Sequence, residues 1–303
     1  MSEAYHPSQT SRGSLVFFSI AMFLVGMEMA ETGASLERMT RVLGLTSSQQ
    51  GFLVSVRFIG GLVVGFALWA GHARVRFKQV LAAALALVAA SGPLLFFSSY
   101  GAALLVAALR GLSMGAMIPL SGMFAAAQRR WASGLVASAV NATLSAGLVL
   151  LSLFATVLAA GFAVTWQLYW APASVLAAVL LVVLPLVHFP PSNPARAAAA
   201  QEPGTASDNP VKRTQWAYAA AGLLLVGSEG TILGLMPAKT AALAGPGQGP
   251  GGELLALFLM SGVLVGRVVG MRLFVKISAG RVLTISASAV VLAALLWSLA
   301  PPA

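Results

Sequence analysis

Nine apolar segments follow one another along the chain, separated by polar connections. An α-helix needs about 20 apolar residues to cross the hydrocarbon core of a bilayer. The pattern therefore predicts an all-α polytopic membrane protein. The expected transmembrane helices lie near residues 14–34, 50–70, 79–98, 102–124, 133–160, 166–188, 216–236, 254–271 and 282–299.

The composition of the chain changes between the sixth and the seventh apolar segment. Residues 190–215 are polar and contain several prolines and an alanine run, which is typical of a flexible linker. We therefore predict three parts. They are an N-terminal six-helix bundle (1–189), a cytoplasmic linker (190–215) and a partial C-terminal bundle of three helices (216–303).

Composition supports this class and argues against several kinds of chemistry. Hydrophobic residues make up 58% of the chain and charged residues 9%, whereas soluble domains carry roughly 25% charged residues. The sequence has no cysteine, and His6, His72 and His188 are too scattered to suggest a metal cluster. It also lacks the glycine-rich phosphate-binding loop that ends in Gly-Lys. We expect no enzyme activity, no cofactor and no direct use of ATP.

The basic residues are distributed as topology signals rather than as a nucleic-acid-binding surface, although the net charge is +10. If the N-terminus is cytoplasmic, only Arg38, Arg41 and Lys239 fall on the outer side. Three arginines fall within spans, and the other twelve of the 18 Lys and Arg residues lie on the cytoplasmic side. An excess of this kind follows the positive-inside rule. We expect a multi-pass protein of the inner or plasma membrane, with a cytoplasmic N-terminus and no nucleic-acid partner.

Three acidic residues lie within apolar segments and mark a repeat. Glu28 and Glu31 are three residues apart and so share a helical face. The sequence Leu-Val-Gly before Met27-Glu28 recurs at 225–227, shortly before Glu229. An acid inside a span is costly and usually marks an ion or substrate path. A repeated span indicates a protein built from two similar halves. We predict that Glu28, Glu31 and Glu229 take part in proton coupling.

Six helices, a linker and a second set that begins like the first resemble the major facilitator superfamily of secondary transporters. The stretch 73–81 resembles the loop between spans two and three of that family, with Ala73 in place of its aspartate. Arg110 resembles the arginine within the family's fourth span. Gly266-Arg267 is similar to a Gly-Arg pair of fucose-permease-like members, the sugar or organic-solute branch. The family usually has twelve spans, so this chain is expected to be truncated after nine.

The charges within the spans predict a polar site. Counting about 1.5 Å per helical residue places Glu28, Arg57 and Arg110 in one layer, and Glu229 should reach it from the other half. A substrate that competes with a carboxylate for an arginine can cause that carboxylate to take up a proton. Arginine also suits an anionic substrate, because its planar fork donates two hydrogen bonds. We expect the substrate-binding residues to be Arg57, Arg110, Asn141 and Arg267.

Two functions follow from this interpretation. The first is a secondary transporter that moves a small polar or anionic solute, together with protons, by alternating access. The second is a non-transporting scaffold or accessory subunit in which the charges are structural ion pairs. A scaffold could bind lipid, a second copy or another protein on the exposed flank of helices 7–9. A transporter should expose Glu28 and Arg57 to a water-filled cavity, whereas a scaffold should bury them.

Overall fold

The structure, a computed structural model, describes residues 12–70, 76–127, 133–161, 165–189 and 251–276, and singly Arg281, Thr284 and Ser288. Within these residues all regular structure is helical, in agreement with the all-α prediction. The helices are α1 (Arg12–Leu43), α2 (Ser47–Ala70), α3 (Phe77–Leu94), α4 (Tyr100–Ala127), α5 (Ser133–Gly161), α6 (Gln167–Val183) with the 3-10 turn η2 (Leu184–Leu186), and α9 (Gly251–Lys276).

The first six expected spans are confirmed, because α1 to α6 are each long and apolar enough to cross a membrane. The expected span near 254–271 lies within α9, whose apolar part is Leu257–Val269. The expected spans near 216–236 and 282–299, and the linker at 190–215, lie outside the described residues or almost entirely so. The division of the chain into three parts therefore stays a prediction.

The turn between α1 and α2 shows how local sequence sets the helix ends. Gly44 has a φ of 63°, the left-handed conformation that commonly ends a helix. Thr46 then caps α2: its Oγ1 accepts from the backbone N–H of Gln49 at 3.3 Å. Its own N–H donates to the Gln49 Oε1 at 2.9 Å. This reciprocal pair is a capping box, which satisfies donors that a helix start leaves unpaired.

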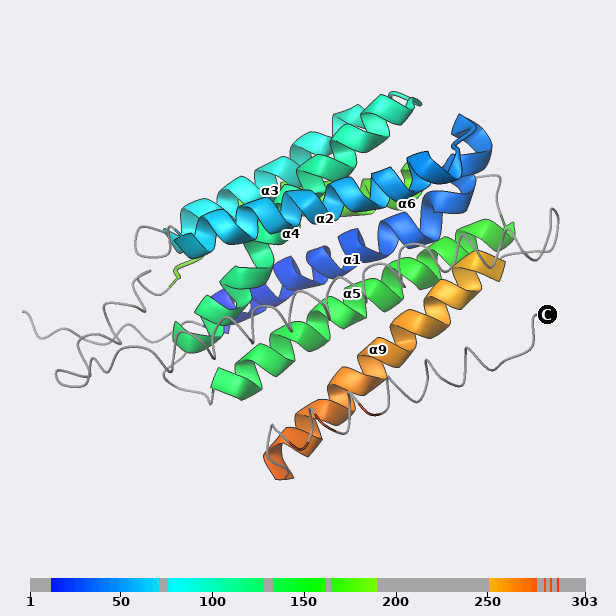
Figure 1. The fold of residues 1–303 in the computed structure, drawn as a ribbon. Helices are drawn as coiled ribbons and strands as arrows, with labels where there is room; N and C mark the ends of the chain where they lie inside the picture. The colour runs from blue at the N-terminus through cyan, green and yellow to red at the C-terminus, as the bar shows by residue number, and fades with distance from the viewer. Residues whose placement is uncertain are drawn as a thin grey trace, which may run out of the picture.

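Helix α1 runs through the middle of the described bundle (Figure 1). It packs mainly on α5 and also on α6, while α2 packs on α4 and α3 lies between α4 and α6. Helix α9 lies along α5 on the far side from α2, α3 and α4 (Figure 1). Lys78, at the start of α3, donates to the carbonyls of Pro185 and Val187 at 3.1 Å each, which ties α3 to the end of α6.

Glycines bring two pairs of helices into backbone contact. At the α2–α4 crossing, a Cβ added to Gly111 would collide with the Arg57 carbonyl, and one added to Gly115 with the Gly61 carbonyl. At the α1–α5 crossing, a Cβ on Gly26 would collide with the Leu144 carbonyl, and α5 offers the matching Gly147. Small residues at such crossings allow close approach of helices in a membrane. The α2–α4 contact fixes the backbone positions of two arginines, Arg57 and Arg110.

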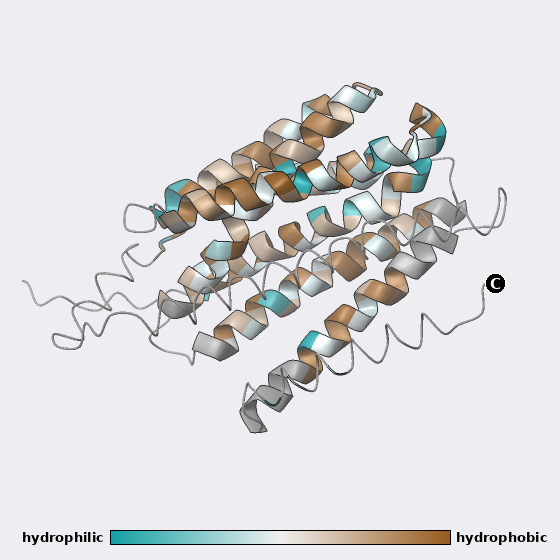
Figure 2. Ribbon diagram, viewed as in Figure 1, coloured by the Kyte–Doolittle hydropathy of each residue, from teal (hydrophilic) through white to brown (hydrophobic). Residues whose placement is uncertain are grey.

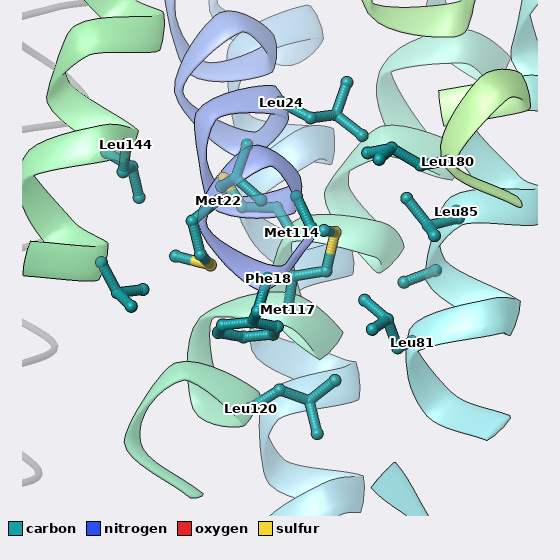
Figure 3. Close-up of a cluster of buried hydrophobic side chains, with 14 of the residues drawn as sticks. Phe18, Met22, Leu24, Leu81, Leu85, Met114, Met117, Leu120, Leu144 and Leu180 are labelled. Carbon is teal, nitrogen blue, oxygen red and sulfur yellow. The ribbon is translucent and has the colours of Figure 1, made fainter. Parts of the chain in front are cut away.

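The apolar core is formed by buried side chains of six helices, α1, α3, α4, α5, α6 and α9, which meet around α1. Figure 3 shows part of this cluster, with Phe18 and Met22 from α1, Leu81 and Leu85 from α3, Met114, Met117 and Leu120 from α4, Leu144 from α5 and Leu180 from α6. The ring of Phe18 stacks on that of Phe124 with centroids 4.6 Å apart. Most helical turns are hydrophobic, with isolated hydrophilic turns inside α2, α5 and α9 (Figure 2).

Candidate functional site

Helix α1 carries two neighbouring polar pairs, each spaced by four residues. Glu28 and Thr32 form one pair, and Glu31 and Ser35 form the other. Residues four apart are neighbours on a helix surface, so each pair occupies its own stripe. The first stripe meets α2 through Thr32, and the second meets α4 and α6. The site therefore occupies one face of α1, as two adjacent stripes.

The second stripe is a closed network centred on Arg110 of α4. The side chains of Arg110 and Glu31 are fully buried, and their charged groups form an ion pair between Nη1 and Oε2. Arg110 Nε donates to the Ser91 Oγ of α3 at 3.1 Å. Its Nη2 donates to the Ser174 Oγ at 2.7 Å and to the Trp170 carbonyl at 2.8 Å, both on α6. Arg110 thus joins four helices at one point.

Trp170 closes this network from the other side. Its Nε1 donates to the Ser35 Oγ at 2.7 Å, and that hydroxyl donates to the Glu31 carbonyl at 2.6 Å. The guanidinium of Arg110 also lies over the Trp170 ring, 5.1 Å from its centroid. An arginine at this distance from the face of an indole is held by a cation–π interaction. Packing and hydrogen bonds together hold the Arg110 side chain in one position.

The first stripe is much less complete. Arg57 of α2 is 3% exposed, and its Nη1 donates to the Thr32 Oγ1 at 2.9 Å. Its Nε and Nη2 have no hydrogen-bond partner within the described part of the chain. Glu28 is 0% exposed, and both of its carboxylate oxygens likewise lack a partner there. Arg57 and Arg110 both interact electrostatically with Glu28. Glu31 Oε1 also lacks a hydrogen-bond partner among the described residues, so each stripe contains a buried carboxylate oxygen without one.

The other expected site residues lie elsewhere. Arg267 of α9 donates to the Ser145 Oγ at 2.8 Å and to the Asn141 carbonyl at 3.2 Å, which joins α9 to α5. Asn141 is exposed and contributes its backbone to this contact. Glu229 lies outside the described residues. The structure brings together Glu28, Glu31, Arg57 and Arg110, while Asn141 and Arg267 form a separate pair.

Several residues of the site were not anticipated from the sequence. They are the small polar and aromatic side chains around the two arginines: Thr32, Ser35, Ser91, Trp170 and Ser174. Hydroxyl groups are common in membrane helices, where each can bond to a carbonyl of its own helix, so most carry no signal. The one available clue was spacing, because Thr32 and Ser35 each follow a glutamate by four residues. No cluster of metal-binding side chains occurs among the residues for which the structure gives a position.

Comparison with known proteins decides the family. The family model described as Major Facilitator Superfamily matches residues 16–303, which is nearly the whole chain. The chain belongs to the Major Facilitator Superfamily. The resemblance seen in the loop motif and the Gly-Arg pair is thereby confirmed at the level of the family. A search of curated proteins finds no match to this sequence.

The solved structure of a sugar–proton symporter agrees with this superfamily assignment at the level of the fold. The crystal structure of a D-xylose–proton symporter matches with a TM-score of 0.55 and 17% identity, covering 86% of this chain and 66% of that one. The crystal structure of the peptide transporter POT with sulfate gives a TM-score of 0.46 and 17% identity, over 78% of this chain and 52% of that one. This superfamily member thus spans just under two thirds of the length of the symporter.

Proposed function

We propose that the protein is a secondary active transporter that moves a small polar or anionic solute across the plasma membrane by alternating access. Transport is coupled to protons through Glu28, with the N-terminus on the cytoplasmic side. The observation that carries the proposal is the Glu28 carboxylate, which is fully buried and has no hydrogen-bond partner among the described residues. A buried polar group without a partner is rare and costly in a native protein. Proton uptake and release by this group gives it a function.

The two glutamates of α1 have different surroundings, and this supports different roles. Glu31 is held by an ion pair with Arg110, which in turn is fixed by three further acceptors. Glu28 interacts with the same arginine and with Arg57 only through their electric field. In the proposed mechanism Glu28 carries the exchangeable proton, and Glu31 balances the charge of Arg110. Glu229 is proposed as a coupling residue of the second half.

The proposed substrate-binding residues are Arg57, Arg110, Asn141 and Arg267. These residues differ in how many of their hydrogen-bond donors already have a partner in the protein. Arg110 uses its donors on the protein itself, and Arg267 bonds to α5. Arg57 keeps two nitrogens without partners in the described region and lies beside the first stripe. Arg57 is thus the best supported of the four, and Arg267 and Asn141 act through the contact between α5 and α9.

The test is solute-driven proton flux in proteoliposomes, with a panel of sugars and small organic acids. Glu28→Gln keeps the shape of the side chain and removes the proton site. We expect it to reduce flux driven by a pH gradient to background while exchange of labelled solute across the membrane continues. Glu37→Gln is the matched control, since Glu37 lies on the same helix in a partly exposed pair with Arg41. Unchanged proton coupling in Glu28→Gln contradicts the proposed role of this residue.

A second candidate function, the non-transporting scaffold or accessory subunit, is favoured by the burial of Glu28 and Arg57. Burial also fits a transporter in an occluded conformation. The two functions therefore differ in whether Glu28 and Arg57 ever become exposed to water. A transporter must expose these groups to water during its cycle. Because the chain has no cysteine, Thr32→Cys introduces a single thiol at the site. Labelling of that thiol by a water-soluble reagent supports the transporter, and complete protection in a folded protein supports the scaffold.

A further inference from the structure

The free edge of Arg57 has the geometry of a binding site for a carboxylate. Nε and Nη2 lie on the same side of a guanidinium and form its side-on fork, and these are the two nitrogens of Arg57 that lack a partner among the described residues. Nη1, on the other side, is held by Thr32 at 2.9 Å. A carboxylate accepts two parallel hydrogen bonds from such a fork. Thr32 therefore holds one end of the guanidinium, and the Nε–Nη2 fork is left without a hydrogen-bond partner among the described residues.

The buried charges of the site sum to zero when all four groups are ionised. Glu28 and Glu31 contribute two negative charges, and Arg57 and Arg110 contribute two positive ones. Glu31 and Arg110 are already paired with each other. The two remaining charges are those of Glu28 and Arg57. Glu28 interacts through space with Arg110 and Arg57, and Arg57 with Glu31 and Glu28, without a hydrogen bond to Glu28. A further negative charge bound at Arg57 would leave the site with an unbalanced charge, which is strongly unfavourable in a buried environment.

The other helices around Glu28 offer little that could balance an added negative charge. Helix α5 has no ionisable side chain between Ser133 and Gly161. On α6 the ionisable group is Tyr169, whose ring lies 5.6 Å from the Arg38 guanidinium. On α9 the ionisable side chain that the structure describes is that of Arg267, which bonds to α5. Among the described residues, protonation of Glu28 is therefore the change that would restore the net charge of the site to zero.

We propose that the Nε–Nη2 fork of Arg57 binds the carboxylate of a small monoanionic solute, and that one proton binds Glu28 with each solute, so that transport is electroneutral. The inference rests on the proposed transporter function. It adds the class of substrate and the net charge that crosses the membrane with each substrate molecule. A monocarboxylate fits better than a phosphate ester, because it is planar like the fork. A phosphate group carries about 1.5–2 negative charges near pH 7, more than one proton would balance.

The first test is electrical and uses the wild-type chain in proteoliposomes. The probes are radiolabelled lactate and benzoate, with lactamide and benzamide as neutral counterparts of the same shape and xylose as an unrelated neutral solute. We expect uptake of a carboxylate that follows the pH gradient and does not change when a potassium gradient with valinomycin sets the membrane potential. A rate that increases with an inside-negative potential, or transport of the amides or xylose in preference to the acids, overturns the inference but leaves a transporter. Absence of transport of every probe, with no binding by calorimetry, overturns the carboxylate inference, while the transporter function is decided by the wider solute panel and by labelling of Thr32→Cys.

The second test assigns the carboxylate to Arg57. Arg57→Gln should weaken carboxylate binding by about 10- to 100-fold, the usual worth of hydrogen bonds to a charged group, and should leave amide binding unchanged. Arg57→Lys keeps the charge but not the fork, so we expect an intermediate loss. Arg41→Gln, at an exposed ion pair, is the matched control and should bind like wild type. Equal loss for acid and amide, or no loss in a folded Arg57→Gln protein, contradicts the assignment.

Discussion

Replacing Arg110 with leucine is expected to lower the free energy of unfolding by about 3–5 kcal/mol, because the substitution leaves a buried carboxylate without its partner. Arg110 is fully buried and pairs with Glu31, and its remaining donors reach α3 and α6. Ser91 and Ser174 would lose a donor at the same time, although their hydroxyls lie 3.4 Å apart and can bond to each other. Unfolding by sodium dodecyl sulfate in mixed micelles measures the change.

The double variant Arg110→Leu with Glu31→Leu separates the ion pair from the packing. Removing both charges of a buried pair is often nearly neutral, so the double variant should recover most of the stability lost in Arg110→Leu. Arg41→Leu provides the control, since Arg41 is 65% exposed and its pair with Glu37 should contribute about 0–1 kcal/mol. A double variant as unstable as Arg110→Leu alone would show that the hydrogen bonds to α3 and α6, and not the Glu31 charge, hold the network together.

Gly111→Ala is expected to destabilise the protein by about 1–3 kcal/mol, as overpacking of a close contact does. The added Cβ would collide with the backbone of Arg57, so α2 has to move away from α4. Gly122→Ala on the same helix has nothing within 4 Å of the added atom. There alanine should be neutral or stabilising by up to about 1 kcal/mol, because it loses less conformational freedom than glycine.

The same pair of variants tests how Arg57 is positioned. A shift of α2 in Gly111→Ala should also weaken binding of the carboxylate probe, since the backbone in contact with Gly111 is that of Arg57. Gly122→Ala should bind the probe like wild type. If Gly111→Ala kept both stability and binding, backbone contact at this crossing could not be what sets the distance between the two helices.

Much of the fold could be predicted from the sequence because it depends on local chemistry. The apolar runs alone predicted α1 to α6, since a helix is what satisfies the backbone in a bilayer. The end of α1 could also be read locally, because Gly44 precedes a Thr46-x-x-Gln49 capping box. The role of Gly111 and Gly115 in close packing follows from their size, and the structure places both against α2.

The arrangement of the site could be predicted only in part. Counting residues along each helix gives depth, and it placed Glu28, Arg57 and Arg110 in one layer. It does not give the direction in which a side chain points, which depends on how each helix is rotated against its neighbours. Depth therefore could not say that Arg110 pairs with Glu31 while Arg57 bonds to Thr32. Nor could it say that α6 supplies Trp170 and Ser174, because contacts between distant helices are fixed by packing.

The glycine contact between α1 and α5 has a consequence for how the bundle can move. At Gly26 and Gly147 the backbones of the two helices meet directly, so no side chain interlocks the helices at these two positions. On its opposite side α1 is held to α4 and α6 by Glu31 and Ser35. The central helix is thus held by an ion pair and a hydrogen bond on one side and makes glycine backbone contact on the other. We expect any movement of α1 relative to its neighbours to occur at the contact with α5, which would carry α9 with it through Arg267.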